Sequence, residues 1–279
     1  MSDPGRTIAA VPTYTAAGRT ITFDDATTHV MGVVNLSPES KNVDTFAGSV
    51  DEAVRMAGGY RSAGATIIDL GAQSSVRGNV ELSPGEEIAR MSGPLEALVG
   101  EGHLVSVDTW KPAVAAAALE LGAAIVNDTG GLQDPEMVSL VAEANAIAIA
   151  MHLEGATTPL AVGELVLDEN KAERMADAFE HRLAELAAAG VDQVILDPGI
   201  GITYATDYDE VTRQQLRVVT GLGAIGRLGP VLLPVPRKKE PARVAAFMTL
   251  AIEHGADVIR VHDVEAACDL VRLFGRAAA

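Results

Sequence analysis

Aromatic side chains and positive charge are both scarce in this chain of 279 residues. Phe, Trp and Tyr make up only 4% of it, too few for the aromatic platforms that stack single-stranded bases. The formal charge of −17 opposes binding to the polyanionic backbone of DNA or RNA. We therefore expect no nucleic-acid partner, and any local group of basic residues becomes informative.

Long apolar runs and paired cysteines are missing as well. No apolar run reaches the ~18 residues of a membrane-spanning helix. The first residues lack the basic and apolar regions of a secretory signal. The single cysteine, Cys268, can form no disulfide within the chain. We expect no membrane association and a cytoplasmic location. The 48% hydrophobic content suffices for one large core.

One stretch, residues 194–201, combines a buried strand with a polar tip. It reads Val-Ile-Leu-Asp-Pro-Gly-Ile-Gly, and its apolar, partly β-branched start is typical of a strand buried on both faces. Asp197 follows at the carboxyl end of this strand. The glycines after it permit a tight turn and let a ligand approach the backbone closely.

The same arrangement of strand and helix recurs along the chain. We predict strands at residues 30–35, 66–71, 104–108, 123–127, 146–152, 193–197, 230–235 and 258–262. We predict helices at 51–63, 85–99, 112–121, 135–144, 169–189, 209–220, 240–254 and 264–276. Eight such units over roughly 250 residues predict the α/β class and a (β/α)₈ TIM barrel. A doubly wound sheet is the alternative, but it would not naturally place functional residues at the tip of every strand.

Prolines mark the starts and glycines the ends of several predicted helices. Prolines stand near four helix starts, where the missing N–H costs little: Pro84, Pro112, Pro135 and Pro241. A weak internal repeat places a glycine between a helix end and the next apolar strand, at Gly64, Gly122, Gly190 and Gly255. We expect these glycines to adopt the left-handed conformation that ends a helix.

The start of the chain is predicted to form a separate leader. Residues 7–14 and 19–23 are expected to pair as a short hairpin that turns at Ala17-Gly18. Such a hairpin can close the bottom of a barrel. We therefore divide the chain into a leader of residues 1–28 and a single barrel of residues 29–279.

Polar residues end the predicted strands. In a (β/α)₈ barrel these ends meet at one mouth, where active sites lie. Carboxylates and amides there can bind a flat heterocycle, basic residues of the last two strands can hold an anion, and neighbouring carboxylates can bind a divalent ion. The tips are Asn35, Asp69, Asp108, Asn127, His152, Asp197, Arg237/Lys238 and Arg260/His262.

The motifs around these tips resemble dihydropteroate synthase, in that family's order and over nearly the whole chain from residue 30. They are MGVVNLSPES (31–40), DLG (69–71), SVDTWK (106–111), IVNDTGG (125–131), MH (151–152), LDPGIG (196–201) and RVHDV (260–264). In that family a pterin with a diphosphate-activated methylene loses pyrophosphate, and the amine of p-aminobenzoate attacks the carbon left behind. The resemblance implies the same barrel, a pterin substrate, Mg²⁺ and a homodimer formed through helices on one flank.

The resemblance also implies roles for individual residues. Pterin recognition falls to Asp108, Asn127, Asp197 and Lys238, and diphosphate binding to Asn35, Arg260 and His262. Asn35 would act through Mg²⁺ as the metal ligand, and Asp69 would support the first loop and the metal region. The catalytic set would be Asp108, Lys238, Arg260 and His262.

The motifs of the p-aminobenzoate half depart from the family. In the first loop, the family has an aromatic residue after Pro-Asp-Ser, where this chain has Lys41. In the second loop, the family's Thr-Arg is Ser75-Val76 here. Later in the chain, Ile202 stands in place of the family's Phe and Lys239 in place of its Ser. Our hypothesis is that the chain binds a pterin but uses p-aminobenzoate poorly or not at all. Divergence with compensating contacts from Lys239 or Arg77 is the simpler alternative.

Two other functions stay open. A non-catalytic or regulatory pterin-binding protein would tolerate the altered loops. A methyltetrahydrofolate-dependent corrinoid methyltransferase shares the barrel and its Asp and Asn tips, but the retained Arg260 and His262 argue against it.

Overall fold

The computed structural model describes residues 11–40, 43–75, 79–153, 155–162, 167–202, 207–236 and 240–278. Eight parallel strands form its centre, in the order β8-β7-β6-β5-β4-β3-β10-β9. They are β3 (His29–Asn35), β4 (Ile67–Gly71), β5 (Val105–Asp108), β6 (Ile125–Asp128), β7 (Ile147–Met151), β8 (Val194–Asp197), β9 (Leu232–Pro234) and β10 (Val258–Val261).

A parallel bridge between Leu196 and Val231 joins the two ends of this sheet. The N–H of Leu196 donates to the carbonyl of Pro230 at 2.8 Å. The strands therefore form the (β/α)₈ barrel that the sequence predicts. Strand β9 spans only part of the predicted 230–235, since Pro230 has no N–H for the ladder and Val231 forms only the bridge to Leu196.

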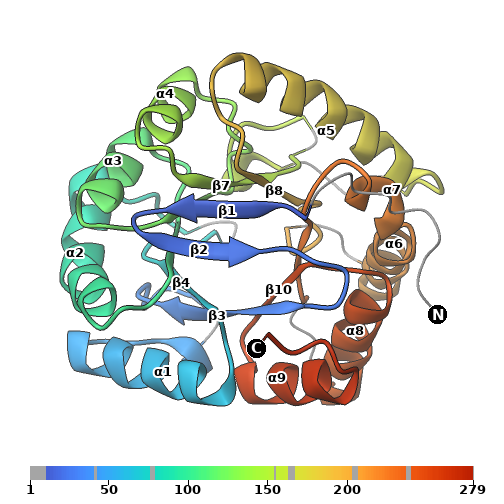
Figure 1. Cartoon of the computed structure of the whole chain (residues 1–279), viewed down its shortest axis with the longest axis horizontal. Coiled ribbons are helices and arrows are strands. Elements are labelled where there is room, and N and C mark those ends of the chain that lie inside the picture. The colour runs from blue at the N-terminus through green and yellow to red at the C-terminus, as the bar shows by residue number, and fades with distance from the viewer. Residues whose placement is uncertain are drawn as a thin grey trace.

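Helices surround the barrel as an outer ring (Figure 1). The predicted helices occur close to their expected bounds, and the described residues add the short α7 and the 3₁₀ turns η1 (Val43–Thr45) and η2 (Pro159–Ala161). The helices are α1 (Val50–Ala63), α2 (Pro84–Gly100), α3 (Pro112–Glu120), α4 (Pro135–Glu143), α5 (Lys171–Ala188), α6 (Tyr208–Thr220), α7 (Leu222–Gly226), α8 (Pro241–Glu253) and α9 (Val264–Leu273). In the described ranges, no helix combines the length and apolarity needed to cross a membrane.

The prolines at the helix starts and the glycines after the helix ends lie where the sequence predicts them. The four prolines are the first residues of α2, α3, α4 and α8. The four repeat glycines all have positive φ: 116° at Gly64, 96° at Gly122, 86° at Gly190 and 82° at Gly255. Each unit of the repeat thus ends its helix in the left-handed conformation before the chain enters the next strand.

The barrel interior has an apolar lower layer and a polar upper layer. Ile67, Ile125, Ile195 and Val258 belong to one buried cluster. Residues two positions along a strand point to the same side, so Asp69, Asn127, Asp197 and Arg260 stand above them. In these four strands, the alternation that fills the lower barrel therefore also directs one polar side chain toward the mouth.

A hairpin of β1 (Thr13–Ala16) and β2 (Arg19–Thr22) closes the lower end of the barrel, where it crosses the strands in Figure 1. Phe23, 2% exposed, joins the apolar layer, and the hydroxyl of Tyr14 donates to the carbonyl of Val194 at 3.0 Å. The predicted closure is confirmed. The first strand begins after Pro12, which lacks an N–H, and predicted residues 7–10 lie outside the described ranges.

Candidate functional site

A buried ion network occupies the upper barrel and centres on Arg260 of β10. Its Nε donates to Oδ2 of Asp69 at 2.7 Å, and its Nη2 lies 2.6 Å from the same oxygen. Nη2 also donates to Oδ2 of Asp108 at 2.7 Å. Asp69 is fully buried, whereas the side chains of Arg260 and Asp108 are each 21% exposed. One guanidinium thus holds the tips of β4, β5 and β10 together.

Neighbouring polar side chains complete this network. Oγ of Ser106 donates to Oδ1 of Asp69 at 2.7 Å. Nδ2 of Asn127 lies 3.4 Å from both carboxylate oxygens of Asp69. Oγ1 of Thr129 lies 3.4 Å from Oδ1 of Asp108. Oδ1 of Asn127 is buried and has no hydrogen-bond partner within the described part of the chain. Such an atom is costly unless something donates to it.

Asp197 stands at the tip of β8, as the sequence predicts. Its side chain is buried, at 4% exposure, and Oδ1 accepts the N–H of Gly199 at 2.7 Å. Gly199 has φ of 68°, and a Cβ there would lie 2.5 Å from the carbonyl of His152, so this turn requires glycine. The predicted tight turn is confirmed, and it leaves one carboxylate oxygen for another donor.

Burial shapes the charge of these carboxyl groups. Burial raises the pKa of Asp197 to about 7, while the Gly199 N–H and Arg260 oppose the rise. Burial also raises the pKa of Asp108, against the attraction of Arg260 and with help from Asp69. Burial disfavours the Arg260 charge, but the carboxylates outweigh it and its pKa rises. A ligand that donates N–H groups to these carboxyls would therefore stabilise their ionised forms.

Asn35 and His262 lie at the tips of β3 and β10, on the first-loop side of the mouth. Oδ1 of Asn35 accepts the N–H of Ser37 at 3.0 Å, and Nδ2 donates to the carbonyl of the same residue at 3.2 Å. Nδ1 of His262 pairs with Oγ1 of the buried Thr45 at 3.1 Å. His262 also lines a cleft of about 820 Å³ with Tyr60 of α1 and Met248 of α8. The described residues thus leave open space beside this histidine.

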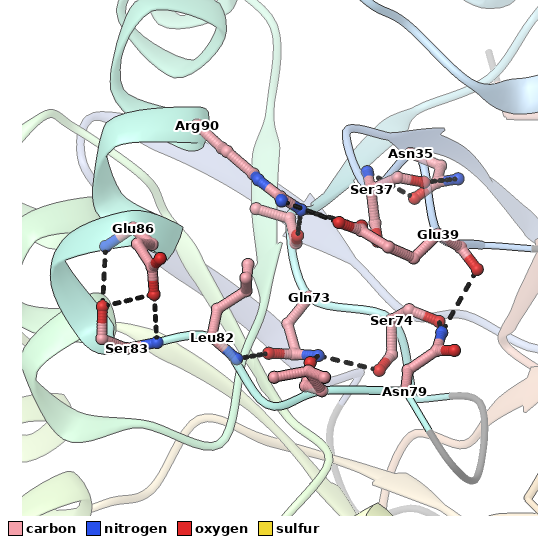
Figure 2. Close-up of polar contacts among 12 residues, drawn as sticks. Asn35, Ser37, Glu39, Gln73, Ser74, Asn79, Leu82, Ser83, Glu86 and Arg90 are labelled. Atoms are coloured by element: carbon pink, nitrogen blue, oxygen red, sulfur yellow. Dashed lines mark hydrogen bonds and ion pairs between the residues drawn. The ribbon is translucent and has the colours of Figure 1, made fainter.

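The first and second loops after β3 and β4 are linked through α2, as Figure 2 shows. Glu39 contacts Arg90 through both carboxylate oxygens, at 2.9 and 3.0 Å. Nδ2 of Asn79 donates to the Glu39 carbonyl at 3.2 Å and to Oγ of Ser74 at 2.7 Å. Side chains thus tie the two loops to each other and to one helix.

Several predicted site residues lie outside the described ranges, namely Lys41, Val76, Arg77, Arg237, Lys238 and Lys239. Ser75 and Ile202 are described, and both are half-buried in loops at the mouth. His152 packs its ring edge-on against Phe179, with ring centroids 5.8 Å apart. The structure therefore brings together Asp69, Asp108, Asn127, Asp197 and Arg260 from the predicted set.

Sequence reasoning missed Ser106, Thr129, Thr45 and the pair of Glu39 and Arg90. A signal existed for Ser106, because it precedes Asp108 by two positions on one strand and so shares its face. Thr45 contacts a residue 217 positions away, and no local pattern encodes that contact.

The oxygen donors around the mouth suit a Mg²⁺ ion that arrives bound to a substrate. They are less suited to an ion held by the protein alone. Among the described residues, no group of three His, Cys, Asp or Glu side chains could hold a metal. Oδ1 of Asn35 keeps a second lone pair and is a hard oxygen ligand. Mg²⁺ often binds through one or two protein oxygens together with substrate phosphates and water, which agrees with this donor set.

Comparisons with known proteins show the family to which the chain belongs. The profile of the family described as "Pterin binding enzyme" matches residues 31–262. The Bacillus subtilis dihydropteroate synthase is 33% identical over 270 residues, which cover 88% of this chain and 87% of the relative. The Mycobacterium leprae enzyme of the same name is 34% identical over 273 residues, covering 90% and 93%.

Some relatives are longer than this chain. A probable bifunctional folylpolyglutamate synthase/dihydropteroate synthase of Haloferax volcanii is 35% identical over 251 residues, which cover 85% of this chain but only 29% of that protein. Among solved structures, the Burkholderia cenocepacia dihydropteroate synthase complexed with 7,8-dihydropteroate superposes with a TM-score of 0.80 and 28% identity, covering 95% of this chain and 96% of that one.

The barrel and its buried polar mouth define a pterin-binding enzyme, and the chain belongs to that family. Within the family it is a transferase of the dihydropteroate synthase type, since the relatives that match along nearly their whole length carry that name.

Proposed function

We propose that this protein joins the methylene of a hydroxymethyl-dihydropterin diphosphate to an arylamine, with loss of pyrophosphate. The observation that carries the proposal is Oδ1 of Asn127, a residue 1% exposed, which has no hydrogen-bond partner among the described residues and belongs to an amide group that lies beside the carboxylate of Asp69. A pterin edge presents several N–H donors, and a buried amide oxygen beside carboxylates provides the acceptors for them.

In this reaction the C–O bond to the diphosphate breaks, the amine nitrogen attacks the methylene carbon left behind, and the new ammonium group gives up a proton to solvent or to the departing pyrophosphate. Asp108, Asn127 and Asp197 would hold the pterin, and the negative charges of the Asp108 and Asp197 carboxylates would stabilise the positive charge left on it. Nη1 of Arg260 has no hydrogen-bond partner in the described ranges, so it can donate to the departing diphosphate. Lys238, outside the described ranges, completes the proposed pterin contacts.

His262 would bind the same diphosphate, and Thr45 would fix the orientation of its ring. Asn35 would contribute an oxygen to Mg²⁺, which supplies positive charge against the developing pyrophosphate. The altered second-substrate loops, with Lys41, Ser75, Val76, Ile202 and Lys239, remain the reason to test p-aminobenzoate rather than assume it.

The test combines turnover with binding. The protein is incubated with Mg²⁺ and the pterin diphosphate, with and without p-aminobenzoate, and pyrophosphate and dihydropteroate are measured. Because the relatives that match along most of their length are named dihydropteroate synthases, we expect release of both products with the amine rather than the poor use that the altered loops suggested, and loss of release when EDTA removes Mg²⁺. Calorimetry on the same samples measures pterin binding. Pterin binding without amine-dependent release would instead favour a repurposed pterin-binding protein.

Three broader properties complete the proposal. We propose one barrel over residues 29–279 preceded by a leader, a homodimer, and a cytoplasmic location. Leu273 of α9, 77% exposed, is an apolar side chain on this flank that can be substituted to test the surface. Light scattering after size exclusion tests the dimer, and a Leu273→Glu variant that elutes as the monomer would assign the surface.

A further inference from the structure

Three separate segments converge beside the barrel mouth: the start of the first loop at residues 37–39, the start of the second loop at 72–74, and its end at 79–82. Arg90 joins the first two of them. Its guanidinium grips Glu39 with two contacts, and its Nη1 also lies 3.4 Å from the carbonyl of Ala72. Arg90 projects from α2 (Figure 2), so a helix of the outer ring supplies a rigid base.

Asn79 joins the remaining segment. Its Nδ2 donates to the backbone of Glu39 in the first loop and to Ser74 in the second. Oγ of Ser37 donates to Oε2 of Glu39 at 2.7 Å, which orients the carboxylate toward Arg90. Arg90 and Asn79 therefore each contact both loops, and Glu39 is the residue that both of them bind.

The second loop has its own anchor below these contacts. Oε1 of Gln73 accepts the N–H of Leu82 at 2.7 Å and lies 3.3 Å from Nζ of Lys111. Nζ of Lys111 donates to Oε2 of the buried Glu87 at 2.7 Å. The base of this loop is thus held independently, and Glu39, Arg90 and Asn79 act on its alignment with the first loop.

We propose that Glu39, Arg90 and Asn79, here called the loop clamp, are positioning residues that set the affinity for the second substrate. The inference rests on the proposed function. Lys41, two positions after Glu39, and Ser75 and Val76, between Ser74 and Asn79, are the second-substrate residues that the sequence assigns to these loops. None of the described contacts of the clamp reaches Asp108, Asn127 or Asp197. The clamp therefore acts on one half of the site.

The clamp is suited to mutation because it lies at the surface. The side chains of Arg90 and Glu39 are 29% and 45% exposed, and exposed ion pairs contribute little to folding stability. A matched control exists on α5, where Nη1 of Arg182 lies 2.9 Å from Oε2 of Glu185 and the side chains are 30% and 48% exposed. Arg182→Gln breaks a pair of equal length and exposure away from the loops.

The experiment compares Arg90→Gln, Glu39→Gln, their double variant and Arg182→Gln. With saturating pterin diphosphate, we expect each single change to raise the KM for p-aminobenzoate about fivefold, equal to about 1 kcal/mol, with kcat changed less than twofold. The double variant should be no worse than Arg90→Gln alone, since the Arg90 change already breaks the contact with Glu39. The Kd for hydroxymethylpterin, which lacks the diphosphate, and the behaviour of Arg182→Gln should not change.

Conservative variants sharpen this result. Glu39→Asp shortens the side chain by about 1.5 Å and should lose the two-point contact, whereas Arg90→Lys should restore only part of the KM because lysine cannot bind both oxygens. Equal KM values in all variants would overturn the clamp. So would a parallel rise in the Kd for hydroxymethylpterin.

A second measurement separates this inference from the proposed function. If the unaltered protein releases no pyrophosphate with p-aminobenzoate, the reaction fails but the clamp is still testable by hydrogen exchange. Arg90→Gln should speed amide exchange in peptides from residues 36–48 and from residues 72–83, neither of which contains the mutation. Unchanged exchange in either loop would refute the clamp.

Discussion

The carboxyl group of Asp197 is where pH should act on pterin binding. It is 4% exposed, and burial raises its pKa from 3.8 to about 7. The proposed contact requires the ionised form, because a carboxylate accepts two N–H donors whereas the protonated group is itself a donor on one oxygen. Binding should therefore displace a proton when the solution is below the pKa.

The size of the effect follows from the ionised fraction. With a pKa of about 7, roughly one tenth of the groups are ionised at pH 6 and roughly nine tenths at pH 8. The pterin affinity should be about tenfold weaker at pH 6 than at pH 8. Asp197→Asn removes the part of this pH dependence that comes from Asp197, while any part that comes from Asp108 remains. The quantity to compare between the variant and the unaltered protein is therefore the ratio of the affinity at pH 8 to the affinity at pH 6.

The same pKa predicts the direction of a stability change. A carboxyl whose folded pKa is raised contributes stability that is present below its unfolded value, near pH 4, and lost as the pH rises through about 7. Asn keeps an oxygen for the Gly199 N–H but carries no charge. The effect of Asp197→Asn on the free energy of unfolding of the unliganded protein should therefore be more favourable at pH 8 than at pH 4, by up to about 4 kcal/mol.

Two assays test this reasoning together. Calorimetry with hydroxymethylpterin at pH 6, 7 and 8 measures affinity, and urea unfolding at pH 4 and pH 8 measures stability. An unaltered protein whose affinity is flat with pH, or a variant with the same pH dependence, would refute the assignment of Asp197. A stability difference between the variant and the unaltered protein that does not shift in favour of the variant from pH 4 to pH 8 would refute the cost of the buried charge.

Two further predictions concern positioning. Thr45→Val removes the hydroxyl that contacts His262 and should weaken inhibition by pyrophosphate by about threefold to tenfold, while Thr45→Ser retains it; equal inhibition constants would separate Thr45 from the diphosphate site. Lys111→Met leaves Glu87, 1% exposed, as an uncompensated buried charge and should cost about 3–5 kcal/mol in urea unfolding. The double change with Glu87→Gln should recover most of that loss, and a double variant as unstable as the single would contradict this account.

Much of the architecture was accessible from local sequence. Apolar runs that end on a polar residue located the barrel strands, because a strand buried on both faces must be apolar until it reaches the mouth. The glycine after each repeat helix predicted a left-handed turn, and positive φ at Gly64 and Gly255 confirms it. These features depend on a few neighbouring residues, so one sequence suffices to predict them.

The partners inside the site were decided by the tertiary structure. The sequence placed Arg260 at a strand tip, but its contact with Asp69, 191 positions away, depends on the closure and register of the barrel. The same holds for Glu39 and Arg90, 51 positions apart, which meet only because α2 packs beside the first loop. Local pattern specifies which side of a strand a residue faces, whereas strand register and helix packing determine which side chain it meets there.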